Sequence, residues 1–86
     1  MYNDVFAEDN KKRIDLMIEL GKRIKLARVE SRMSQLQVGV SLGVSDKTIS
    51  GYESDRISPP INKLMKLCDL LKKPISFFLD QDQHVK

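Results

Sequence analysis

The chain has 86 residues, 41% of them hydrophobic and 31% charged, which suits one small globular domain. Its single cysteine and single histidine exclude a disulfide framework and the common zinc sites. No segment has the pattern of a signal peptide or approaches the roughly 18 apolar residues that cross a bilayer. A soluble cytoplasmic protein with no membrane segment is therefore expected.

The net charge is only +3, but the charges are unevenly distributed. Residues 1–20 carry five acidic and three basic groups. Residues 21–32 carry five basic groups and one acidic group, and residues 58–79 carry four basic groups and one acidic group. An acidic start followed by two basic helices suits a face that meets a polyanion, and solvated helix surfaces account for the pattern equally well.

The N-terminal part of the chain divides into an arm and a long helix. Residues 1–11 are polar and predict a flexible arm. From Lys12 to Arg28, apolar residues recur at three- and four-residue steps, which is the pattern of one buried helix face. The helix is expected to end near Ser31.

Two short helices follow. Ser34 and Gln37 form an S-x-x-Q capping box that opens the first of them, and Gly43 ends it by taking the left-handed conformation at little cost. Ser45 caps the next helix, and the helix dipole favours Asp46 in its first turn. Two short helices joined by a tight glycine turn predict a helix-turn-helix. Its inward set is expected to be Val38, Leu42, Val44, Ile49 and Tyr52.

A fourth helix is expected to have Ser58 as its cap and Pro59 as its first residue. Its predicted apolar stripe consists of Ile61, Leu64, Met65, Cys68 and Leu71, widened by Leu67 and Leu70. We expect Cys68 to pack in the core rather than to act as a reactive thiol.

Pro74 ends the fourth helix, and Ser76 is expected to cap a short fifth helix over residues 77–80. Residues 81–86 form a frayed tail. Because no segment alternates with period two, no sheet is expected. The sequence therefore predicts an all-α protein whose folded domain spans residues 12–80.

The outside of the third helix carries short and polar residues, namely Asp46, Lys47, Ser50 and Gly51. A helix that enters the major groove needs donors and acceptors for base edges and little bulk. Residues 45–53 are therefore predicted to be a recognition helix.

These segments resemble the phage-repressor, Cro and Xre family of helix-turn-helix proteins over about residues 21–80. The matching parts are Arg28, Ser34-Gln35, Gly43-Val44-Ser45, Ile49-Ser50, Tyr52-Glu53, Pro59 and Ile75-Ser76-Phe77-Phe78-Leu79. The resemblance implies a compact five-helix domain of the lambda-repressor-like type, with an ion pair between Arg28 and Glu53. It also implies that Gln35 holds a phosphate and braces the recognition helix.

The resemblance assigns DNA contacts to Gln35, Ser45, Asp46, Lys47, Thr48, Ser50, Gly51, Tyr52, Ser54 and Arg56, with Ser58 in the same backbone-gripping loop. Asp46 either accepts from a cytosine amino group or positions Lys47 or Gln35, and positioning is slightly favoured. Phe77, Phe78 and Leu79 lie where relatives often dimerise, and a dimer seam is favoured over closure of the core.

Three positions depart from the family pattern. Gly39 stands where alanine is usual, which costs about 0.8–1 kcal/mol of helix stability. Gly51 has no side chain with which to read a base, so readout is expected to rest on Lys47 and Ser50. Asp55 replaces a usual glycine, and aspartate tolerates the left-handed conformation better than most residues.

The sequence thus predicts a sequence-specific double-stranded DNA-binding regulator of transcription, a repressor that binds a pseudo-palindromic operator as a homodimer. One alternative is the antitoxin of a toxin–antitoxin pair, which would bind a toxin protein as well as DNA, with residues 1–20 available for that partner. Another is the DNA-binding end of a longer inducible repressor. No cofactor, metal or enzymatic activity is expected, since no nucleophile–base set or phosphate loop is visible.

Overall fold

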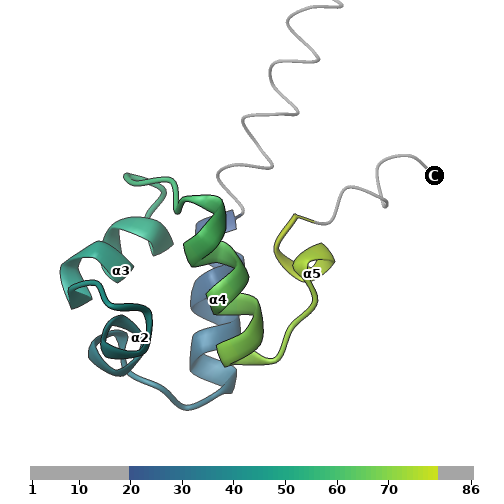
Figure 1. The fold of residues 1–86 in the computed structure, drawn as a ribbon, viewed down its shortest axis with the longest axis horizontal. Helices are drawn as coiled ribbons and strands as arrows, with labels where there is room; N and C mark the ends of the chain where they lie inside the picture. The colour runs from purple at the N-terminus through teal and green to yellow at the C-terminus, as the bar shows by residue number, and fades with distance from the viewer. Residues whose placement is uncertain (1–19, 80–86) are drawn as a thin grey trace, which may run out of the picture.

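The computed structural model describes residues 20–79, which form helices joined by short turns around one core (Figure 1). Residues 20–30 are helical, and they are followed by α2 (Gln35–Leu42), α3 (Asp46–Glu53), α4 (Ile61–Leu71) and α5 (Ile75–Leu79). No strand occurs between residues 20 and 79, so the all-α prediction is confirmed. The predicted arm (1–11), the predicted helix residues 12–19 and the tail (81–86) lie outside the described residues.

The helix of residues 20–30 runs behind α4, with α2 and α3 on one side of this pair and α5 on the other (Figure 1). The buried apolar residues form one cluster that draws on all of these helices. They are Ile24, Ala27, Val38, Leu42, Ile49, Tyr52, Leu64, Leu67, Cys68, Leu71 and Phe78. Burial, and then the nearby carboxylate of Asp69, raise the pKa of the Cys68 thiol, which favours the neutral packing role expected for it.

The turn between α2 and α3 follows from local hydrogen bonds. The Ser34 hydroxyl accepts from the Gln37 amide (3.0 Å), and the Gln37 side chain accepts from the Ser34 amide (2.7 Å), so the capping box is confirmed. Gly43 has a φ of 77°, as its predicted left-handed role requires. The Ser45 hydroxyl then accepts from the Thr48 amide (3.1 Å) and opens α3.

The predicted start of the fourth helix is wrong. α4 begins at Ile61, Pro60 occupies the N-cap position with a ψ of 159°, and no side chain caps the helix. The reason is that a residue before proline is driven out of the helical region, so Pro59 cannot begin a helix while Pro60 follows it. Ser58 is therefore too early in the chain to serve as the cap.

The predicted apolar stripe of α4 is also partly wrong. Leu64, Leu67, Cys68 and Leu71 are buried, whereas Ile61 is 66% and Met65 is 52% exposed. Several apolar residues at helical spacing allow two neighbouring stripes. Packing against the other helices selects one of them.

The fifth helix begins at Ile75, so Ser76 lies inside it and does not cap it. The Pro74 carbonyl accepts from the Phe77 amide (2.9 Å), and the chain therefore turns directly after the proline. Phe78 is only 1% exposed and belongs to the core, which corrects its assignment to a dimer seam. Phe77 is half-buried and stacks edge-on against Phe78, and Leu79 is 41% exposed.

The charge pattern did not decide whether the basic side chains of the later helices face solvent or bind a polyanion. Lys63 and Lys73 instead make contacts within the domain. The Lys63 ammonium donates to the Leu42 carbonyl at the end of α2 (2.9 Å). Lys73 pairs with Glu30 (3.1 Å) and lies over the Phe77 ring. The contacts with Leu42 and Glu30 join residues far apart in the chain, which a charge count does not reveal.

Candidate nucleic-acid interface

The helix α3 lies at the edge of the domain against α2, away from α5 (Figure 1). One of its faces is buried and contains Ile49, Tyr52 and Glu53, while Asp46 and Lys47 are exposed. This arrangement presents a helix face to the outside without removing the helix from the core. It is the geometry that insertion into a groove requires.

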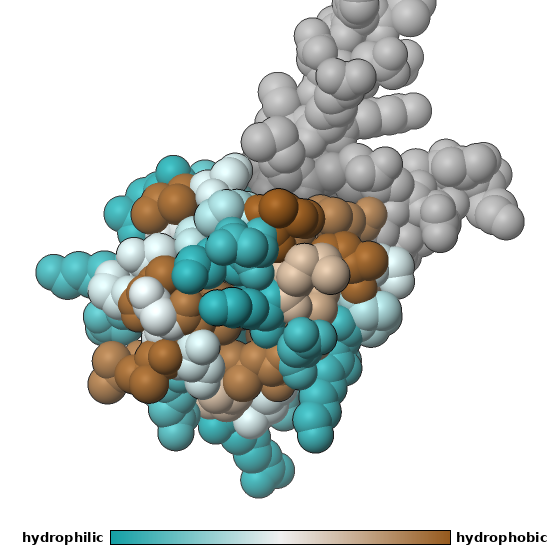
Figure 2. All heavy atoms as spheres, viewed as in Figure 1, coloured by the Kyte–Doolittle hydropathy of each residue, from teal (hydrophilic) through white to brown (hydrophobic). Residues whose placement is uncertain are grey.

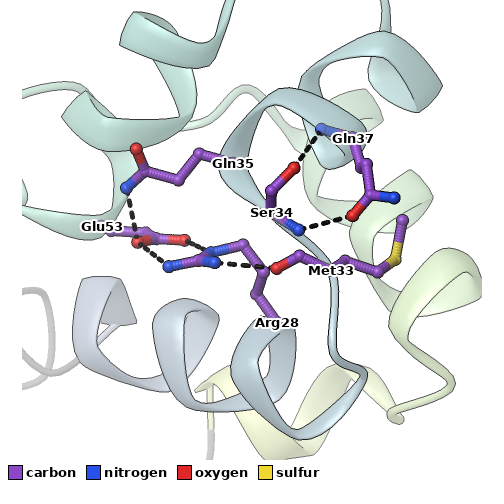
Figure 3. Close-up of polar contacts among 6 residues, drawn as sticks. All are labelled: Arg28, Met33, Ser34, Gln35, Gln37 and Glu53. Carbon is purple, nitrogen blue, oxygen red and sulfur yellow. Dashed lines mark hydrogen bonds and ion pairs between the residues drawn. The ribbon is translucent and has the colours of Figure 1, made fainter.

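A polar network holds the C-terminal end of α3 (Figure 3). Arg28 Nε donates to Glu53 Oε2 (2.6 Å), and the Arg28 Nη2 atom donates to Glu53 Oε1 (3.2 Å). The Arg28 Nη1 atom donates to the Met33 carbonyl (2.8 Å), which extends the network to the start of α2. The predicted ion pair is therefore confirmed, and its two side chains are 12% and 4% exposed.

Gln35 completes this network. Its side-chain nitrogen donates to Glu53 Oε1 (3.0 Å), so the first residue of α2 is tied to the last residue of α3 (Figure 3). The predicted bracing role of Gln35 is confirmed by this bond. Its phosphate contact stays a prediction.

The N-terminal half of α3 differs from the C-terminal end in its side-chain bonds. No side-chain hydrogen bond or ion pair joins Asp46 or Lys47 to another residue of the described chain, so the Asp46 carboxylate does not position Lys47 or Gln35 as expected. Thr48 is partly buried, and its hydroxyl lies 3.0 Å from that of Ser45.

Two predicted contact residues are buried. Tyr52 is 3% exposed and belongs to the core, which agrees with its place in the predicted inward set but not with a DNA contact, and burial raises the pKa of its hydroxyl. Gly51 is covered by Ile57, because a β-carbon on Gly51 would lie 2.5 Å from Ile57 Cδ1. Neither residue lies open to a ligand as the sequence suggested.

The loop after α3 is folded back by its own polar groups. Arg56 Nε donates to the Ser54 hydroxyl (2.9 Å), and the Ser54 hydroxyl donates to the Gly51 carbonyl (3.3 Å). Asp55 has a φ of 64°, which confirms its expected left-handed conformation. Its carboxylate accepts from the Gly21 amide (3.1 Å), a link to the first described helix that the sequence did not indicate. Ser58, the last residue of the predicted gripping loop, is exposed.

An open hollow of about 330 Å³ lies between α3 and this loop. Its lining consists of Lys47, Thr48, Ser50, Arg56 and Ile57. Four of these residues were predicted to contact DNA, and the fold brings them together. Ile57 was missed, although an isoleucine in an otherwise polar loop was a visible signal.

The described residues are more basic than the chain as a whole. Residues 20–79 contain eleven lysines and arginines and five carboxylates, against a net charge of +3 for all 86 residues. Within this range no cluster of histidine, cysteine or carboxylate residues is arranged to hold a metal ion. None of the described helices is long and apolar enough to cross a membrane.

Known proteins resemble the chain over most of its length. A helix-turn-helix family model matches residues 24–78. Uncharacterized HTH-type transcriptional regulators of Sinorhizobium medicae (strain WSM419) and Rhizobium meliloti (strain 1021) are each 34% identical over 73 residues, which is 85% of this chain and 52% of theirs. The HTH-type transcriptional regulator ImmR of Bacillus subtilis (strain 168) is 30% identical over 66 residues, 77% of this chain and 52% of its own. The chain thus spans about half the length of these curated relatives.

Proposed function

This chain belongs to the helix-turn-helix family of the phage-repressor, Cro and Xre type, and from that premise we propose that it is a sequence-specific DNA-binding repressor of transcription. The observation that carries the proposal is the division of α3 into a buried face, on which Glu53 is bonded to Arg28 and Gln35, and an exposed face with unused polar groups. Residues 45–53 enter the major groove, and occupancy of the operator blocks transcription.

The exposed face supplies the groups that read and grip DNA. Lys47 offers an ammonium group to base acceptors, and the hydroxyl of Ser50 either donates or accepts. Arg56 uses only its Nε within the described residues, for Ser54, so its remaining guanidinium nitrogens are available to a phosphate. The side-chain nitrogen of Gln35 has two N–H donors. One donates to Glu53, and the other donates to a neighbouring phosphate.

The protein acts as a homodimer on a pseudo-palindromic operator, with half-sites about one helical turn apart. The largest apolar area in Figure 2 lies over the region of α5, where Ile75 and Leu79 are exposed. A second copy would cover this surface. Sedimentation equilibrium of the wild type and of Leu79→Asp tests whether this surface joins two copies. A monomeric wild type at operator-binding concentrations would exclude the dimer.

Binding-site selection from random duplex DNA, followed by footprinting, tests the proposal as a whole. We expect one enriched symmetric sequence and a loss of about 10³–10⁵ in affinity between 50 and 200 mM salt, if 6–10 phosphates are contacted. Absence of any enriched sequence would refute specific recognition. Repression itself is tested with a reporter gene placed behind the selected site.

The antitoxin alternative assigns a second partner, a toxin protein, to residues 1–20. Almost all of this segment lies outside the described residues, and no observation in the described domain favours that partner. Purification of the native protein together with a small toxin would favour it.

A further inference from the structure

Ile57 is an apolar side chain on the surface that the proposed function turns towards DNA. It is 44% exposed and lines the hollow together with Lys47, Thr48, Ser50 and Arg56. Its neighbours in the hollow are cationic or carry hydroxyl groups. An apolar group in that setting needs an explanation, because the polar contacts described above make no use of it.

The side chain of Ile57 occupies the space beside Gly51, which has no side chain of its own. Gly51 follows Lys47 by four residues and therefore lies on the same face of α3. A β-carbon on Gly51 would lie 2.5 Å from Ile57 Cδ1 and 2.9 Å from Ile57 Cγ1. The exposed face of α3 is thus completed by a residue from the following loop.

Ile57 is also held in position by the backbone. Its amide donates to the Gly51 carbonyl (3.1 Å), and the Arg56 amide donates to the same oxygen (3.0 Å). The Ser54 hydroxyl donates to this carbonyl as well (3.3 Å). Three donors on one acceptor fix the loop against α3, so that Ile57 is presented in one place.

We propose that Ile57 determines part of the sequence specificity by contacting the 5-methyl group of a thymine in the major groove. This inference rests on the proposed function. The thymine methyl is the apolar group on the major-groove edge of the base pairs, whereas cytosine presents an amino group there. The Ile57 side chain has no acceptor for that amino group, and Lys47 and Arg56, which line the same hollow, supply the positive charge that draws the duplex to this surface.

The test is a double-mutant cycle between protein and DNA. In the selected operator, each thymine is replaced in turn by deoxyuridine, which removes only the methyl group. We expect the wild type to lose about fourfold in affinity at one position of each half-site, since burial of one methyl-sized group has about that effect. Ile57→Ala should bind the thymine and deoxyuridine duplexes equally at that position.

Two further variants secure the result. Ile57→Val lacks only the terminal carbon and should retain the fold. On replacement of thymine by deoxyuridine, it should lose less affinity than the wild type does. Val40→Ala, which shortens a 73% exposed apolar residue on α2, should keep the wild-type discrimination. Circular dichroism melts of each variant report on folding.

An Ile57→Ala protein that discriminates thymine from deoxyuridine as well as the wild type does would overturn the assignment, as would a wild type indifferent to every substitution. The proposed function would survive both results, because the selected operator would still be bound. A protein that enriches no sequence at all would instead overturn both.

Discussion

The two faces of α3 use their polar groups in opposite ways. On the inner face, Glu53 accepts from both Arg28 and Gln35 and is 9% exposed, beside the buried side chain of Ile49. On the outer face, Asp46 and Lys47 are exposed, and their side chains make no hydrogen bond within the described residues. A helix that reads DNA needs both conditions, because groups left free for bases cannot also hold the helix in place.

Removal of Glu53 should break the inner face most severely. Glu53→Ala leaves the mostly buried Arg28 guanidinium without its partner, and the loss of one partner of such a pair costs about 3–5 kcal/mol. Urea denaturation measures the free energy of unfolding. The double variant Arg28→Met with Glu53→Leu is the control and should recover most of the loss, because no buried charge is then left unpaired. If Glu53→Ala were as stable as the wild type, the network would be dispensable.

A side chain on Gly39 should disturb the crossing of α2 and α3. In Gly39→Ala the new β-carbon would lie 2.7 Å from the Val44 carbonyl oxygen, a backbone atom that cannot rotate away. The cost of overpacking, about 1–3 kcal/mol, outweighs the gain in helix propensity of about 1 kcal/mol. We expect a net loss of about 1 kcal/mol in thermal or urea unfolding. Ser41→Ala, at an exposed position of the same helix, is the matched control, and a stabilised Gly39→Ala would contradict the expectation.

Lys63 should stabilise the end of α2, just before the turn to α3. Lys63→Met keeps the aliphatic stem but removes the donor to the Leu42 carbonyl, and we expect a loss of about 0.5–1 kcal/mol. Lys66→Met changes the same charge at an exposed position of α4 and should leave stability unchanged. Equal unfolding midpoints for the two variants would show that the bond contributes nothing.

Changes on the outer face should separate stability from binding. Lys47→Ala should alter the free energy of unfolding by less than about 0.5 kcal/mol, because the side chain is exposed and unbonded within the described residues. It should weaken binding to the selected operator by about 1–3 kcal/mol if Lys47 reads a base. An equal loss on operator and random DNA would make Lys47 a phosphate contact instead.

Most of the helix-turn-helix was predictable because its signals are local. The bonds of Ser34, Gln37 and Ser45 span three residues, and Gly43 needs only its own backbone freedom. The Arg28–Glu53 pair spans 25 residues and was available only through the family resemblance. The start of α4 was predictable in principle, since the effect of Pro60 on Pro59 is also local.

The exposed surface was less predictable. Helical spacing placed Gly51 on the outer face correctly, but no periodicity shows that Ile57 returns from the loop to cover it. The bond from Lys63 to Leu42 and the burial of Phe78 likewise depend on segments far apart in the chain. Such contacts require the relative positions of two elements, which a pattern within one element does not contain.

The sequence by itself determined that residues 34–53 form two capped helices around a left-handed glycine, because hydrogen bonds between near neighbours set those features. The tertiary structure alone decided which groups remain free to meet DNA. A side chain is buried, bonded or exposed according to what packs against it, and for Lys47, Gly51 and Ile57 that is the meeting of α3 with the loop that follows it.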